Sequence, residues 1–381
     1  MEFEGFDPEE PYPQAVLGNR WALLTALGVS CPKLNALRDL VYEDIDTERL
    51  GIGWWQEHLD PQRRILIADY LLQCFDAVHE NMLEARLHLL HLPHFRREQS
   101  KFVASAVTVG PRGRIATKLP PRTRPADDIP WAMINLHTAG VVRASASALD
   151  CLGGIIVGVA AVETEIVRTD FRRACRALAN MVQDQSAALA LLRTLKSSLE
   201  AAEAEAGPTG WLSWVVDYRN MLVHRGRRIG KSLLRSTVTL VGPSGEPLPR
   251  VEAVELLPRE PGLSEIQTLA CVGPSSVLEE DAQDTLKGVV GSTRQLVEDV
   301  AQLLEPVWRT RRAEPNLLRQ PAKQWKLEAV MPSAFRGYRP GSVQFTPDMF
   351  VVAPEWTVRL KSAALDDRRS SVWANQKKDV P

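Results

Sequence analysis

Residues 217–226 read DYRNMLVHRG, and this stretch decides how the middle of the chain folds. Apolar residues recur around it with the spacing of a helix that has one face in a core. These residues are Trp211, Trp214, Val215, Tyr218, Met221 and Leu222. Thr209 is the expected N-cap, and Gly226 is the expected left-handed residue after the last turn. The sequence therefore predicts one amphipathic helix between these two residues.

The opposite face of this helix carries polar residues, which are Ser213, Asp217, Asn220 and His224. Asn220 and His224 are neighbours at a spacing of four residues, whereas Arg219 lies about 100° round the helix from Asn220. Histidine moves protons near neutral pH, and arginine binds a phosphate through two hydrogen bonds. Cleavage of RNA without a metal needs both of these functions. The alternative is a helix end whose cations only interact with the helix dipole.

Arg219 is followed directly by the polar Asn220, and four residues separate Arg219 from His224. This pattern resembles the Arg–four-to-six–His motif of HEPN domains, and Tyr218 and Gly226 on either side are similar too. The resemblance implies a helical bundle that dimerises, so that two motifs form a metal-independent endoribonuclease, often a toxin or an anti-phage effector. It implies catalytic roles for Arg219 and His224, and an orienting or RNA-binding role for Asn220. Some HEPN domains are not nucleases, so a non-catalytic scaffold that binds a partner protein or a nucleotide is the alternative.

The composition of the whole chain limits the function classes. A chain of 381 residues with 45% hydrophobic residues and a net charge of -1 is typical of a soluble globular protein, so any RNA contact must be a local patch. The five cysteines form no CxxC pair, which favours a reducing compartment. The acidic N-terminus lacks the apolar core of a signal peptide, and the apolar run at 152–162 is too short to cross a bilayer. We expect a cytoplasmic protein that uses no cofactor and no metal.

A local basic patch does follow the motif, at Arg225, Arg227, Arg228 and Lys231. We predict that it binds the RNA backbone, and the alternative is a solvated loop without a partner. The segment 226–232 looks like a phosphate-binding P-loop. However, it has three residues between its glycines where a P-loop has four, and it follows a helix where a P-loop follows a strand. It is therefore not expected to bind a nucleoside triphosphate.

The chain is predicted to be mainly α, a HEPN-like antiparallel helical bundle with small β-hairpin insertions. Three regions are expected: an arm with short helices at 1–60, a helical domain at 61–310 with a β-rich insertion near 230–275, and an extension with short strands and a mobile tail at 311–381. The expected elements are a helix from Pro61 to about Leu92, strands within 102–118, helices at 131–168 and 171–206, strands on both sides of a turn within 236–257, a strand at 266–272 and a helix at 277–310. Gly153-Gly154 is a candidate break in the second helix.

Three histidines, His88, His91 and His94, follow one another at three-residue spacing, and Glu84 lies one turn before the first. Such spacing is compatible with a metal site on one side of a helix. Pro93 is expected to break the helix before His94 and so to separate the ligands. The sequence therefore favours a helix end with exposed histidines over a metal site.

Overall fold

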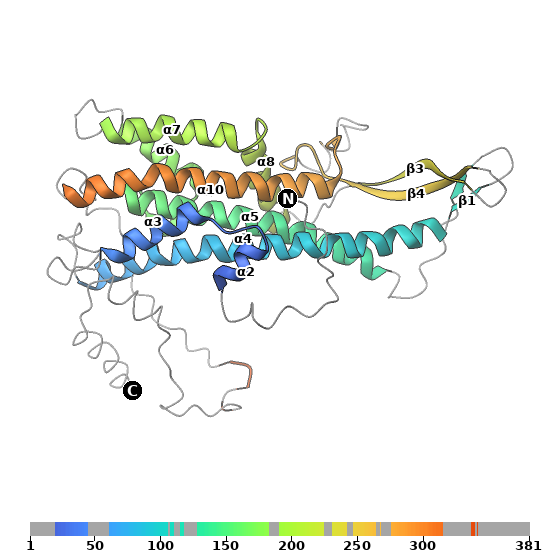
Figure 1. Cartoon of the computed structure of the whole chain (residues 1–381), viewed down its shortest axis with the longest axis horizontal. Helices are drawn as coiled ribbons and strands as arrows, with labels where there is room; N and C mark the ends of the chain where they lie inside the picture. Colours follow the sequence, from blue (N-terminus) through green and yellow to red (C-terminus); the bar gives the residue numbers. More distant parts are fainter. Residues whose placement is uncertain are drawn as a thin grey trace. The chain divides into compact units, whose positions relative to one another are not determined.

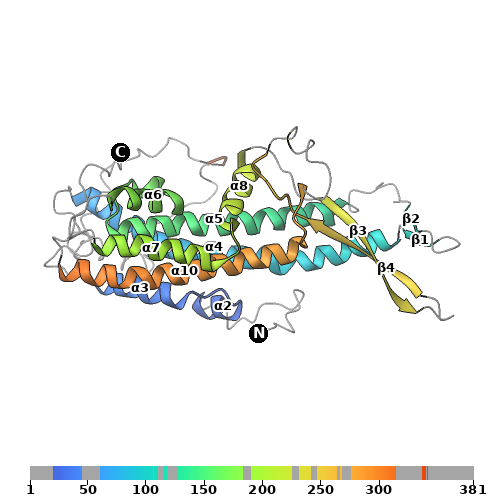
Figure 2. The same ribbon diagram turned by 90° about the horizontal axis from the view of Figure 1, so that it is seen from above.

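Most of the residues that the computed structural model describes are helical, and the described part also contains two separate two-stranded sheets (Figures 1 and 2). The described residues are 20–44, 61–105, 107–109, 115–117, 128–182, 190–224, 231–241, 247–263, 267, 276–314, 337–339 and 341. The prediction of a mainly helical fold with small β-hairpins is confirmed at this level.

The helices are α2 (Arg20–Ala26), α3 (Pro32–Glu43), α4 (Pro61–Ser105), α5 (Ile129–Ala160), α6 (Phe171–Met181), α7 (Ala190–Ala206), α8 (Trp211–His224) and α10 (Ala282–Ala313), with a 3-10 turn, η4 (Ile166–Arg168), between α5 and α6. Strands β1 (Val107–Val109) and β2 (Ile115–Thr117) pair antiparallel, in the register Val107 to Thr117. Strands β3 (Lys231–Val241) and β4 (Pro247–Leu256) form a longer antiparallel ribbon, in the register Lys231 to Leu256. The predicted strand at 266–272 lies outside the described residues, apart from Gln267.

Helix α4 continues through Pro93 for 45 residues, so the prediction that Pro93 ends it is wrong. A proline inside a helix removes one backbone hydrogen bond and crowds the preceding turn, at a cost of about 3 kcal/mol. Leu89 and Leu92 are buried before Pro93, and Val103 is buried after it. Burial of apolar side chains on both sides offsets the cost, because each fully buried leucine contributes about 2 kcal/mol.

Helix α5 continues through Gly153 and Gly154, so the candidate break at these glycines is also wrong. A Cβ atom at Gly153 would lie 2.4 Å from the carbonyl carbon of Asp170, and one at Gly154 would lie 2.7 Å from the sulfur of Cys74. The glycines therefore allow other segments to pack closely against α5. The helix ends earlier than predicted, at Ala160, because the buried Ala161 takes a left-handed φ of 52°.

Helix α5 is also the one helix in the described part of the chain that is long and apolar enough to cross a membrane. Most of its apolar stretch, 78%, is buried inside the protein. Core helices of soluble proteins have the same length and composition, so this feature is weak evidence for a membrane span.

The predicted helix at 171–206 is two helices. Asp170 caps α6 by accepting a hydrogen bond from the backbone N–H of Arg173 at 2.7 Å, and the helix ends at Met181. Helix α7 begins at Ala190, and residues 183–189 lie outside the described part. The predicted helix at 277–310 is confirmed as α10, with its start five residues later.

The chain divides into two compact units. Unit 1 comprises Met1–Cys31, Val78–Leu149 and Ala201–Val297, and unit 2 comprises Pro32–Ala77, Asp150–Glu200 and Glu298–Pro381. In unit 1, Arg96 of α4 binds Asp281 through two hydrogen bonds of 2.5 and 2.6 Å, just before α10 begins. This ion pair fixes the second half of α4 against the start of α10.

Unit 2 contains a fully buried arginine, Arg311 of α10. Its guanidinium donates hydrogen bonds to the carbonyl oxygens of Gly158 and Val159, at 2.7 and 3.1 Å. These carbonyls belong to the last turn of α5, where a helix has unpaired acceptors and a partial negative charge. Burial lowers the pKa of Arg311 to about 9, so it stays charged at neutral pH. Nearby in the sequence, Trp308 and Arg312 both bind the buried carboxylate of Asp44.

Candidate functional site

The site predicted by the motif lies on α8, in unit 1. Gly210, with a φ of 84°, precedes the first helical residue, so Thr209 is one position too early to be the N-cap. The N–H of Trp211 donates to the carbonyl of Pro208, and that of Trp214 donates to Gly210, both at 3.0 Å. The backbone turn at 208–210 therefore starts α8, where the sequence predicted a side-chain cap.

One face of α8 is buried, as the periodicity predicts, although Trp214 is only half-buried and Leu212, which was not predicted, is buried. The buried residues are Trp211, Leu212, Val215, Tyr218, Met221 and Leu222. The indole N–H groups of two tryptophans hold the helix in place, because Trp211 donates to the carbonyl of Glu203 at 3.2 Å and Trp214 donates to that of Pro258 at 2.8 Å. These contacts fix the rotation of α8 about its own axis.

The polar stripe of α8 faces away from this core. Asp217 is exposed, and Ser213 and Asn220 are half-buried. Val223, between Leu222 and His224, is 53% exposed although it is apolar. The stripe that carries the motif is therefore accessible to a ligand along Asp217 and Asn220.

Arg219 is half-buried, and His224 is the last residue of α8. Five residues along an α-helix correspond to a rotation of about 140°, so the two backbone positions lie on different sides of α8. The side chain of His224 lies outside what the structure describes. Arg219 and Asn220 are adjacent in the chain but about 100° apart round α8, and Arg219 is not on the line that Asn220 and His224 share.

The predicted RNA-binding patch lies mostly outside the described residues, because Arg225, Arg227 and Arg228 fall within 225–230. The backbone of Lys231 begins β3, and its side chain is also outside the described part. A strand thus begins at the end of the segment that resembles a P-loop, where a P-loop would continue into a helix.

A second arginine, which the motif did not predict, lies beside the end of α8. Nη2 of Arg143, on α5, is 3.5 Å from the carbonyl oxygen of Leu222. Arg143 is half-buried, and its buried Nε has no hydrogen-bond partner among the described residues. A guanidinium at this place meets the partial negative charge of the helix end. The sequence did hold a signal for this arginine, because Arg143 and Asp150 are the two Arg, Lys, Asp or Glu residues in the mostly apolar α5.

Beneath α8 lies a buried polar group that sequence reasoning also missed. Tyr218 is fully buried, and its hydroxyl has no hydrogen-bond partner among the described residues. Burial, and secondly the nearby carboxylate of Glu255, raise the pKa of Tyr218, so its hydroxyl stays protonated. Glu255 is itself buried and accepts a hydrogen bond of 2.9 Å from Gln99 of α4. Polar groups from α4, β4 and α8 therefore meet below the motif.

The histidines of α4 do not lie at a helix end. Because α4 continues through Pro93, His88, His91 and His94 share one helix, and all three are half-buried. His88 meets a fourth histidine, His137 of α5, with 2.9 Å between their Nδ1 atoms. A Cβ atom at Gly140 would lie 2.3 Å from the His88 ring, so the missing side chain makes room for this pair.

His137 is 7% exposed, and its ring stacks against the rings of both His91 and Phe95. Burial, followed by the charges of His88 and His91, lowers the pKa of His137 to about 4. Glu84 lies 3.6 Å from the other nitrogen of His88. No three His, Cys, Asp or Glu side chains in the described part of the chain converge in a way that would hold a metal ion.

The chain was compared with protein-family models, with curated proteins and with solved structures, and no match was found in any of the three. What the site on α8 does is therefore inferred from its own residues.

Proposed function

We propose that this protein is a metal-independent endoribonuclease of the HEPN type, which acts in the cytoplasm as a toxin or an anti-phage effector. His224 is the general acid or base, Arg219 binds the scissile phosphate, and the 2′-hydroxyl of the RNA is the nucleophile. Asn220 orients these groups or contacts the RNA. The observation that supports this proposal is the end of α8, where Arg219, Asn220 and His224 occupy the last six residues of a helix with an accessible polar stripe.

The proposal includes a homodimer, because Arg219 and His224 are about 140° apart on one helix. Two copies of α8 that meet at their polar stripes would bring the arginine of one copy to the histidine of the other. The apolar, 53% exposed Val223 beside His224 is compatible with such an interface. The basic segment with Arg225, Arg227, Arg228 and Lys231 would then bind the RNA backbone on either side, and an antitoxin or another defence protein would be a further partner.

The first test measures cleavage of RNA by the purified protein in the presence of EDTA. We expect His224→Ala to lower the cleavage rate by about 100-fold or more, the usual size of a general acid–base contribution. Arg219→Lys keeps the positive charge but cannot form the two parallel hydrogen bonds that a guanidinium makes to a phosphate, so it should lower the cleavage rate as well. Lys287→Gln, at an exposed lysine of α10 in the same unit that pairs with Asp284 at 3.2 Å, is the control and should cleave normally. Unchanged cleavage by His224→Ala would refute the assignment.

A mixing experiment tests the shared site. Arg219→Ala and His224→Ala proteins are each inactive under the proposal. If the residues act across two copies, a mixed dimer contains one site with both Arg219 and His224, and activity returns on mixing. If they act within one copy, no site is complete and the mixture stays inactive.

The alternative is a non-catalytic scaffold, which the β3–β4 ribbon favours. This ribbon of two strands pairs with no third strand in the described part of the chain (Figure 1). Its outer edges can therefore pair with another chain. A protein that cleaves no RNA, and that loses a bound partner when β3–β4 is shortened, would fit this function.

A further inference from the structure

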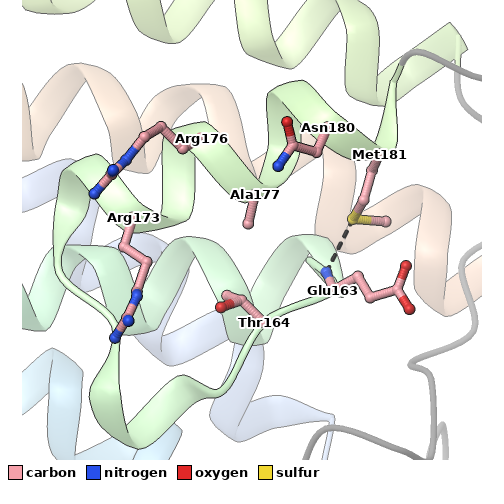
Figure 3. Close-up of a pocket in the computed structure, with 7 residues that line it drawn as sticks. All are labelled: Glu163, Thr164, Arg173, Arg176, Ala177, Asn180 and Met181. Atoms are coloured by element: carbon pink, nitrogen blue, oxygen red, sulfur yellow. Dashed lines mark hydrogen bonds between the residues drawn. The ribbon is translucent and has the colours of Figure 1, made fainter.

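Unit 2 contains a cleft between α6 and the loop that follows α5, away from the motif in the sequence (Figure 3). The left-handed Ala161 turns the chain out of α5, and the N–H of Val162 donates back to the carbonyl of Val157 at 3.2 Å. Glu163 and Thr164 then pass under α6. The cleft has a volume of about 530 Å³, within the range of small-molecule sites.

Contacts at both ends hold the walls of this cleft. At one end Arg173 extends from α6 towards the loop, and its Nη1 donates to the carbonyl of Arg168 at 2.6 Å (Figure 3). At the other end the N–H of Glu163 donates to the sulfur of Met181 at 2.9 Å. The cleft is therefore formed before any ligand binds, which lowers the entropy that binding costs.

The charge of the cleft is positive. Arg173 and Arg176 both line it, one turn apart on α6. In the described part of the chain, neither guanidinium meets an acidic side chain. Arg173 binds the carbonyl of Arg168, and Arg176 binds that of Arg172 at 3.4 Å. Like charges one turn apart repel each other, so a bound anion would relieve this repulsion. The carboxylate of Glu163 points away from the hollow (Figure 3).

The remaining polar groups are neutral. Thr164 offers a hydroxyl from the loop, and Asn180 offers an amide from the last turn of α6. No aromatic residue is among the seven residues that line the cleft, so a nucleobase would find nothing to stack on.

We propose that this cleft binds a small non-aromatic anion through a phosphate or a carboxylate group. Arg173 and Arg176 hold the oxyanion by charge-assisted hydrogen bonds, which are stronger and shorter than neutral ones. Thr164 and Asn180 bind the hydroxyl or carbonyl groups of the rest of the molecule. This function is independent of RNA cleavage, because it uses no residue of α8.

The test is calorimetric titration of the whole chain with two probes, glycerol 3-phosphate for a phosphate monoester and malate for a dicarboxylate. We expect one of them to bind saturably, and the stronger probe identifies the chemistry of the ligand. The double variant Arg173→Gln, Arg176→Gln should weaken that binding by at least about 10-fold. Ala177→Leu should weaken it too, because the larger side chain fills the cleft while both charges remain.

Arg309→Gln is the matched control, since Arg309 is an exposed arginine of α10 in the same unit and pairs with Glu305 at 2.9 Å. It removes a charge without touching the cleft, and binding should be unchanged. The proposal is overturned if neither probe binds below roughly 10 mM, or if Arg309→Gln weakens binding as much as the double variant does. Full binding by Ala177→Leu would place the anion outside the cleft and would overturn it as well.

Discussion

At the scale of single residues, the contact between His88 and His137 shows how burial sets a protonation state. Their Nδ1 atoms are 2.9 Å apart, so one nitrogen must donate and the other must accept. The buried Nε2 of His137 has no hydrogen-bond partner among the described residues, and protonation of both ring nitrogens would create a buried charge. His137 is therefore neutral in the folded protein at physiological pH.

This neutral histidine makes stability depend on pH. A free histidine binds a proton below about pH 6.5, whereas His137 does so only near pH 4. Between these values the unfolded chain binds a proton that the folded chain does not. The free energy of unfolding should therefore fall as the pH falls from about 6.5 to about 4, by on the order of 2 kcal/mol from this residue. Urea unfolding across this range measures the fall.

His137→Phe isolates the contribution of this residue, because phenylalanine can keep the stacking with His91 and Phe95 but cannot bind a proton. We expect the variant to lose less stability than the wild type between pH 7 and pH 4.5. Parallel pH profiles for the two proteins would mean that His137 is not the group that titrates.

At the scale of helices, two glycines with the same local structure should respond to alanine in opposite ways. A Cβ atom at Gly153 of α5 would meet the backbone of Asp170 and Phe171 within 2.6 Å, and backbone cannot rotate away. Gly153→Ala should therefore lower the free energy of unfolding by about 2 kcal/mol or more. Gly288 of α10 is exposed and has nothing within 4 Å of the added atom. Gly288→Ala should raise stability by up to about 1 kcal/mol, because alanine favours a helix.

Thermal or urea unfolding of the two variants decides between these signs. Both substitutions remove the same backbone freedom from the unfolded chain, so the difference between them measures the packing at Gly153. Stabilisation by Gly153→Ala would show that α5 and the start of α6 are not in close contact.

The helices also show what local sequence can predict. Periodicity identified the buried face of α8 and the approximate position of α10, because a helix with one face in a core repeats at a fixed spacing. It failed at Pro93 and at Gly153-Gly154, where residues that normally disrupt helices lie inside them. There the packing of distant segments outweighs local preference, and a single sequence does not show which segments pack together.

The same limit applies to the candidate site. The motif placed Arg219, Asn220 and His224 at the end of one helix, because their spacing is local. Arg143 was missed, since it contacts Leu222 from 79 residues away. The His88–His137 contact spans 49 residues and was missed for the same reason. Groups that a fold brings together from distant parts of the chain leave only a weak signal, such as one arginine in an apolar helix.

At the scale of the whole molecule, stability depends on buried polar contacts between distant segments. Arg311 is one of these, because it lies 152 and 153 residues from the carbonyls that it binds. Arg311→Ala should destabilise unit 2 by about 3–5 kcal/mol, since it leaves a cavity and two buried carbonyls without donors. Arg309→Ala, on the exposed side of the same helix, should change stability by less than about 1 kcal/mol. Urea unfolding measures both, and similar values would contradict the role of Arg311.

The alternation of the two units along the sequence has a consequence for synthesis. Each unit is assembled from three stretches of chain, and α4, α5, α7 and α10 each contribute to both. When α5 has left the ribosome, both units have begun and neither can be finished. Unit 1 needs the chain up to Val297, and unit 2 needs the chain from Glu298 onward, so α10 ends the last stretch of unit 1 and begins that of unit 2. Apolar surface of α4 and α5 therefore stays exposed until α10 has been synthesised. A chaperone that binds nascent apolar segments would act on this surface before α10 emerges from the ribosome.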